Sequence, residues 1–179
     1  MNSENIYYSP NNVYFKCNIR KIDKINSVKE DFWCDFSITK YWAPSTIPME
    51  YINNTTLINN KSCQELNEPK IYIKNLIKFS KLNVNYDLIT IDSVNYIEKT
   101  INYFAKLKAN FNFTKFPKDI QNLSIIIQAC DDSNSIRLLQ SQKYKSLISA
   151  INTFQHSHEW RLYHKLTSKE IITNNAYAK

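Results

Sequence analysis

Apolar and polar positions alternate in two runs near the N-terminus. The apolar positions of these runs are Val13, Phe15, Cys17 and Ile19, and then Phe32, Cys34, Phe36 and Ile38. A period of two is that of a β-strand with one buried face. The polar segment from Asp23 to Asp31 lies between the runs. The pattern therefore predicts two strands joined by a loop.

The same pattern predicts more strands farther along the chain. Ile71 and Ile73 alternate behind Pro69, a residue common at the start of a strand. Further strands are expected at residues 88–97, 101–113, 123–127 and 136–139. Residues 142–154 fit helical spacing as well as strand spacing. The turn-rich stretch from Pro44 to Pro69 predicts loops with at most one short strand.

The stretch from Phe104 to Ala129 joins two of the expected strands through one sharp loop. That loop has the sequence Phe116-Pro117-Lys118-Asp119-Ile120-Gln121. Pro117 fixes a backbone angle, and Asp119 offers side-chain oxygens to nearby amide groups. The residues therefore predict a tight turn formed without glycine.

This aromatic-Pro-x-Asp-x-Gln loop resembles the signature loop in the extracellular domain of the pentameric ligand-gated ion channels. Other parts of that pattern follow in the same order. Trp42 ends the second strand, although Ala43-Pro44 stands where the family usually has Asp. The segment from Pro69 to Asn75 is similar to the family's Pro-x-Ile-x-Ile-x-Asn element, and Glu159-Trp160 to its Glu-Trp strand. Animal members close the loop with a disulfide at the positions held here by Asn110 and Leu123, so the chain resembles the cysteine-less, prokaryote-like branch.

The resemblance implies an all-β fold, an immunoglobulin-like β-sandwich of the neurotransmitter-gated channel ligand-binding type without its last strand. Several short strands with turn signals between them favour an Ig-like sandwich independently. We expect a flexible N-terminus at residues 1–12, the sandwich at 13–165 and a tail at 166–179. A chain of 179 residues fits one such domain.

The resemblance also implies a function. It places a small-molecule ligand between the subunits of a homo-pentamer and a coupling loop next to a membrane domain, which is missing from this chain. The candidate ligand-binding residues are Tyr72, Lys74, Trp160 and Tyr163, and the candidate coupling residues are Phe116, Pro117, Asp119 and Gln121. A lysine at the site accommodates an anionic or neutral ligand more easily than a quaternary ammonium ion.

A soluble β-sandwich interaction module with no channel role is the alternative. The family's aromatic ligand box matches poorly, because Ser37, Lys74 and Cys130 stand at three positions that are often aromatic in the family. The resemblance implies a membrane-associated or extracellular location. No signal peptide and no transmembrane span are expected, since no run approaches the roughly 18 apolar residues that a span needs. A cytoplasmic location is therefore the alternative.

Composition changes this picture little. The net charge of +7 is spread over the chain without a block of Lys and Arg, so we expect no nucleic-acid binding. Glycine is absent, which excludes glycine-rich phosphate loops and the Gly-x-Ser-x-Gly elbow. We expect no enzymatic activity and no cofactor. The four cysteines lack metal-ligand spacing, and His156, His158 and His164 fit a surface loop better than a metal site.

Overall fold

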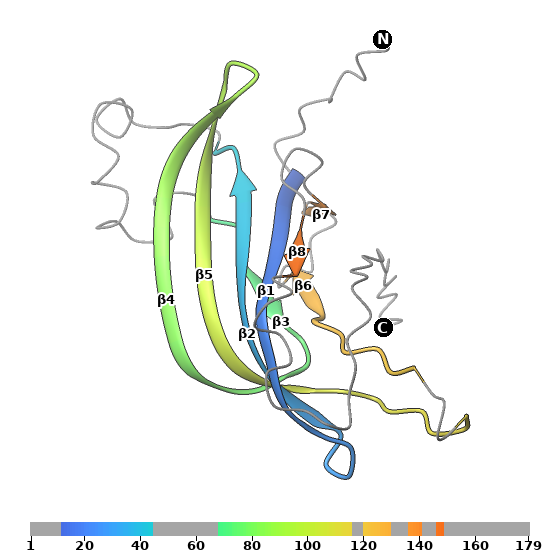
Figure 1. Cartoon of the computed structure of the whole chain (residues 1–179). Coiled ribbons are helices and arrows are strands. Elements are labelled where there is room, and N and C mark those ends of the chain that lie inside the picture. Colours follow the sequence, from blue (N-terminus) through green and yellow to red (C-terminus); the bar gives the residue numbers. More distant parts are fainter. Residues whose placement is uncertain (1–11, 45–67, 116–119, 130–135, 141–145, 149–179) are drawn as a thin grey trace, which may run out of the picture.

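The structure is a computed structural model of the chain, and it describes residues 12–44, 68–115, 120–129, 136–140 and 146–148 (Figure 1). These residues form eight β-strands and no helix. The predicted all-β class is therefore confirmed. The segments that were expected to form loops at 45–67 and a strand at 159–163 lie outside the described residues. No helix that could span a membrane occurs in the described ranges.

Four long strands form most of a curved sheet (Figure 1). In the order β4-β5-β2-β1 across the sheet, they are Leu76–Ile91, Val94–Lys108, Asp31–Trp42 and Asn12–Asn26. All neighbouring pairs among the four are antiparallel. The short strands β7 (Arg137–Gln140) and β8 (Leu147–Ile148) pair with β1 in parallel, so the sheet is mixed.

A second, two-stranded sheet consists of β3 (Ile71–Ile73) and β6 (Ile127–Ala129). It packs on one face of the large sheet, and the two layers share a hydrophobic core. We call this the core face and define it by the apolar side chains that point to β3 and β6. Its most buried members are Phe32, Cys34, Phe36, Ile38, Ala105 and Leu107. This two-layer arrangement is consistent with a β-sandwich.

The β4–β5 turn corrects one strand prediction. Residues 88–97 were expected to form a single strand, but Asp92 and Ser93 form a turn inside this range. Both residues have positive φ, 49° and 66°, which the two central positions of the favoured hairpin turn require. Without glycine the chain uses Asp and Ser here, and the apolar run continues across the turn. Alternation alone therefore did not show the break.

Strand bounds differ elsewhere as well. β1 extends through Asp23 to Asn26, because a register shift between Asp23 and Asn26 lets the polar end keep its pairing with β2. β5 ends at Lys108 and not at Phe113, and β6 begins at Ile127 and not at Leu123. The first half of β4 was not predicted as a strand, because its sequence breaks the alternation with two register shifts before Leu82. The predicted strands at 71–73 and 136–139 are confirmed, the latter shifted by one residue.

Candidate functional site

The segment from Ala109 to Ile126, which we call the β5–β6 loop, is the candidate coupling element. It is described except for residues 116–119. Asn75, in the turn between β3 and β4, connects both ends of this loop. Its side-chain Nδ2 donates hydrogen bonds to the carbonyl oxygens of Lys108 and Ser124, each at 2.8 Å. Its Oδ1 accepts a hydrogen bond from the backbone N–H of Ile126 at 3.0 Å.

A second closure lies farther out in the loop. The amide of Gln121 pairs with the backbone of Asn112 in both directions, with Nε2 donating to the Asn112 oxygen at 2.7 Å and the Asn112 N–H donating to Oε1 at 2.8 Å. The Asn112 side chain in turn accepts a hydrogen bond from the Thr114 N–H at 3.0 Å. The two arms of the loop, residues 109–115 and 120–126, are therefore held together by hydrogen bonds.

The structure places only part of the predicted coupling motif. Gln121 is described and has the bridging role just given, whereas Phe116, Pro117 and Asp119 lie outside the described residues. Asn110 is exposed, and Leu123 packs against the hydrophobic core. Sequence reasoning named Gln121 as part of a motif but missed its bridge to Asn112.

One end of the molecule carries exposed apolar side chains. Val28 in the β1–β2 turn is 91% exposed, and Ile120 and Phe113 in the β5–β6 loop are 70% and 45% exposed. The turn and the loop leave the sheet at the same end (Figure 1). They are also connected, because the Ala109 N–H donates to the Glu30 oxygen at 2.8 Å. This end therefore presents apolar residues from two separate segments.

Two of the four candidate ligand residues lie beside the base of the loop. Tyr72 is 43% exposed and pairs with Gln128 in the β3–β6 ladder. The Lys74 side chain is exposed, and its backbone N–H donates to the Ile126 oxygen at 2.8 Å. Trp160 and Tyr163 lie outside the described residues.

A buried charge cluster on the core face was not predicted. The carboxylate of Glu68 receives Lys40 Nζ at 2.5 Å and Lys99 Nζ at 2.6 Å on one oxygen, and the Tyr86 hydroxyl donates to the other at 3.0 Å. The exposed fractions of these three charged side chains are only 2%, 10% and 8% for Lys40, Lys99 and Glu68. Lys40 Nζ also donates to the Pro69 oxygen at 2.6 Å. A sequence signal existed, because Lys40 follows Phe36 and Ile38 in the apolar register.

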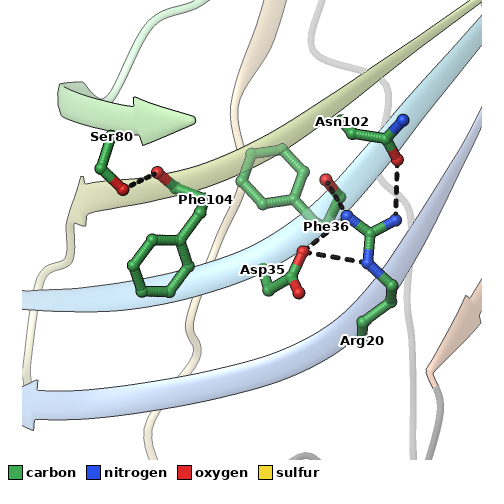
Figure 2. Close-up of polar contacts among 6 residues, drawn as sticks. All are labelled: Arg20, Asp35, Phe36, Ser80, Asn102 and Phe104. Carbon is green, nitrogen blue, oxygen red and sulfur yellow. Dashed lines mark hydrogen bonds and ion pairs between the residues drawn. The ribbon is translucent and has the colours of Figure 1, made fainter. Parts of the chain in front are cut away.

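The opposite face of the sheet carries the Arg20–Asp35 ion pair, which is more exposed. Arg20 of β1 reaches across β2 to β5, and its guanidinium donates to Asp35 Oδ1 and Asn102 Oδ1, with Nε and Nη1 each at 2.9 Å (Figure 2). It also donates to the Phe36 oxygen at 3.3 Å. The Arg20 and Asp35 side chains are 39% and 37% exposed. The arrangement joins three strands, and it leaves the ion pair in contact with water.

Two cysteine thiols lie on the core face, and both are free. Burial raises the pKa of the Cys17 thiol from 9.0 to about 12, and it raises the pKa of the Cys34 thiol further. A thiol that stays protonated is a poor nucleophile and a poor metal ligand. In the described ranges no three His, Cys, Asp or Glu side chains form a group that could hold a metal ion, and the three histidines lie outside them.

No family model matches the sequence, and no curated protein is similar enough to count as a relative.

Proposed function

We propose that the chain is a ligand-binding domain resembling the extracellular part of a pentameric ligand-gated ion channel. It recognises a small ligand and couples to a pore that a membrane domain supplies. One observation carries this proposal: the segment with the candidate ligand residues Tyr72 and Lys74 is hydrogen-bonded directly to the base of the β5–β6 loop. Recognition and transmission would thus share a continuous set of contacts.

The proposed fold is the immunoglobulin-like sandwich of that family. The support for it is a large sheet with a small sheet packed on one face, and the antiparallel pairing of the Ile71–Ile73 strand with the strand that follows the loop. In this proposal ligand binding shifts a conformational equilibrium, because the ligand has different affinities for two positions of β3.

The exposed apolar side chains at one end of the molecule favour a binding partner there. Val28, Phe113 and Ile120 project from two segments that the Ala109 to Glu30 hydrogen bond joins. Apolar side chains gathered at one end of a domain mark an interaction surface. A membrane domain is the partner that this proposal assigns to them.

The charge near β3 bears on the ligand. Lys70 and Lys74 flank β3, and both side chains are exposed. Two ammonium groups at the two ends of a three-residue strand favour an anionic ligand and disfavour a cationic amine. We therefore assign the ligand to small anions or neutral polar molecules.

The test combines assembly with ligand binding. Light scattering of the purified chain over a concentration series should give five times the mass of one chain. A thermal-shift screen of small carboxylates and neutral amino acids should then give a stabilising ligand. Lys74→Glu should weaken that ligand at least tenfold, whereas the matched variant Lys70→Glu should change its affinity less. A chain that stays monomeric and is stabilised by no compound contradicts the proposal.

The second candidate function is a soluble interaction module. Among the described strands β4 lies at the edge of the large sheet, and four of its apolar side chains are 39–52% exposed: Ile77, Phe79, Leu82 and Val84. An exposed sheet edge is a common site for adding a partner strand. A monomer that loses binding to a protein partner upon Leu82→Lys, and not upon Lys74→Glu, would favour this function.

A further inference from the structure

Asn75 makes an unusual number of contacts for one short side chain. Both amide N–H groups and the amide oxygen are used, and its backbone oxygen accepts a further hydrogen bond from the Lys108 N–H at 2.9 Å. Its side-chain partners lie 33, 49 and 51 residues away along the chain. One residue thus connects the β3–β4 turn to the end of β5 and to the segment that leads into β6.

We propose that Asn75 is a positioning residue that makes the β3–β4 turn and the β5–β6 loop move as one body. The first step is geometric. Lys108 and Ser124 stand at the two ends of the loop, and the Asn75 amide donates to both, so it sets the distance between them. No change in the turn can leave these bonds intact unless both ends of the loop follow.

The second step concerns the outer closure. The Gln121 to Asn112 pair lies beyond the Asn75 contacts, and it depends on the two arms of the loop keeping their alignment. If Asn75 sets that alignment, then loss of its bonds weakens the outer pair as well, although the hydrogen bonds of Asn75 given above go to other residues. An effect at Asn112 therefore separates a positioning role from a local contact.

The third step connects this arrangement to the candidate ligand residues. Lys74 precedes Asn75 directly, and its own N–H donates to the Ile126 oxygen. A displacement of Lys74 by a ligand would reach the loop through two adjacent residues. This last step rests on the proposed function, whereas the mechanical unit itself does not.

The experiment is amide hydrogen exchange of the purified chain, measured by NMR without any ligand. Asn75→Asp keeps the size and the acceptor oxygen, but it places a carboxylate against two carbonyl oxygens. We expect the amides of Ile126 and Asn112 to exchange at least tenfold faster, and the amides of the β1–β2 pair to stay within twofold. The matched control is Asn85→Asp, at an exposed residue of β4, which should leave all these rates unchanged.

A disulfide across the loop tests the same proposal, because it should restore the slow exchange that the Asn75 variant loses. The double variant Asn110→Cys with Leu123→Cys puts two cysteines between the two noncovalent closures, and the mass of the chain shows whether they form a disulfide. In the Asn75→Asp background this disulfide should return the Asn112 rate to within about threefold of the wild-type value. If Asn75→Asp fails to fold, Asn75→Ser removes the same donors without adding a charge, and the expected rates are the same.

Three results would overturn the proposal. They are an unchanged Asn112 rate in the Asn75 variant, an equal acceleration of all amides, and a disulfide that forms without slowing Asn112 exchange. The proposed function fails separately, because it is tested by assembly and ligand binding. A monomer without a ligand but with the expected exchange rates would keep Asn75 as the positioning residue and remove the receptor role.

Discussion

Two charge clusters of the large sheet differ in their contact with water. On the core face Lys40, Lys99 and Glu68 meet with at most 10% of each side chain exposed. On the opposite face Arg20 and Asp35 pair with more than a third of each side chain exposed. Each cluster includes one residue of β2 and one of β5, namely Lys40 and Lys99 in the first and Asp35 and Asn102 in the second. The clusters differ in how much of their surface other residues cover.

This difference decides what each cluster contributes. Charges removed from water need their partners, because the cost of burying an unpaired ion is several kcal/mol. Charges that keep water contact lose little when a partner is removed. Removal of one partner should therefore lower stability strongly in the buried cluster and only slightly in the exposed one.

The largest effect is expected at Glu68. Glu68→Gln keeps the shape but removes the negative charge that holds two buried ammonium groups. We expect a loss of about 3–5 kcal/mol in the free energy of unfolding, measured by urea denaturation. The matched control is Glu30→Gln, whose carboxylate is 44% exposed and 3.3 Å from Lys108 Nζ. That control should cost less than about 1 kcal/mol.

The comparison fails if Glu68→Gln and Glu30→Gln lower the free energy of unfolding by the same amount. A further variant separates pairing from burial, namely Lys40→Met, Lys99→Met and Glu68→Leu together. Replacing a whole buried ion cluster by apolar side chains of similar volume is often neutral or stabilising by about 1–4 kcal/mol. A triple variant that is as unstable as Glu68→Gln would show that the cluster supports the fold by more than mutual charge compensation.

The sequence pattern predicted which residues form the core face, but it did not predict the charge cluster on that face. The alternation at Phe32, Cys34 and Phe36 predicted the buried side of β2, because strand geometry places every second residue on one face. The same register puts Lys40 inside, but Glu68 comes from a distant segment. Pairing across that distance depends on tertiary structure, and no local pattern contains it.

The candidate site was predictable to a similar degree. The predicted motif included Gln121, and the loop that contains this residue does join β5 to β6. The role of Asn75 was not predicted, because each of its side-chain partners is a backbone group, and backbone groups carry no sequence signal. Boundaries failed for a related reason. Asp92 and Ser93 adopt positive φ in a chain without glycine, so the usual turn residue was missing from the sequence.

The second effect concerns the thiols on the core face and alkaline pH. Burial raises the pKa of Cys17 to about 12 and that of Cys34 further, and it raises the pKa of Tyr103 above 10.0. Above pH 9.0 the thiols ionise in the unfolded chain and stay protonated in the folded one. The folded state then binds more protons, so stability falls as pH rises, by about 1.4 kcal/mol per pH unit for each thiol.

Urea denaturation between pH 8 and pH 10.5 measures this slope. Cys34→Ala should reduce the slope of stability against pH by the contribution of one thiol. It also lowers stability at every pH, because it leaves a cavity. A thiol reagent should label Cys34, which is 1% exposed, no faster than the folded chain unfolds. A slope unchanged by Cys34→Ala would show that this thiol does not stay protonated inside the core.

The smallest effect is expected on the opposite face. Arg20→Ala removes the bonds to Asp35, Asn102 and the Phe36 oxygen, yet the Asp35 and Asn102 side chains are partly exposed, so water replaces the lost donors there. We expect a loss of about 0.2–1 kcal/mol, and a smaller loss in 1 M salt, because screening weakens exposed pairs. Arg20→Lys keeps the charge but lacks the planar fork that serves two acceptors at once, so it should recover only part of the loss. A cost for Arg20→Ala as large as that for Glu68→Gln would mean that linking three strands, and not burial, decides which charge cluster the sheet depends on.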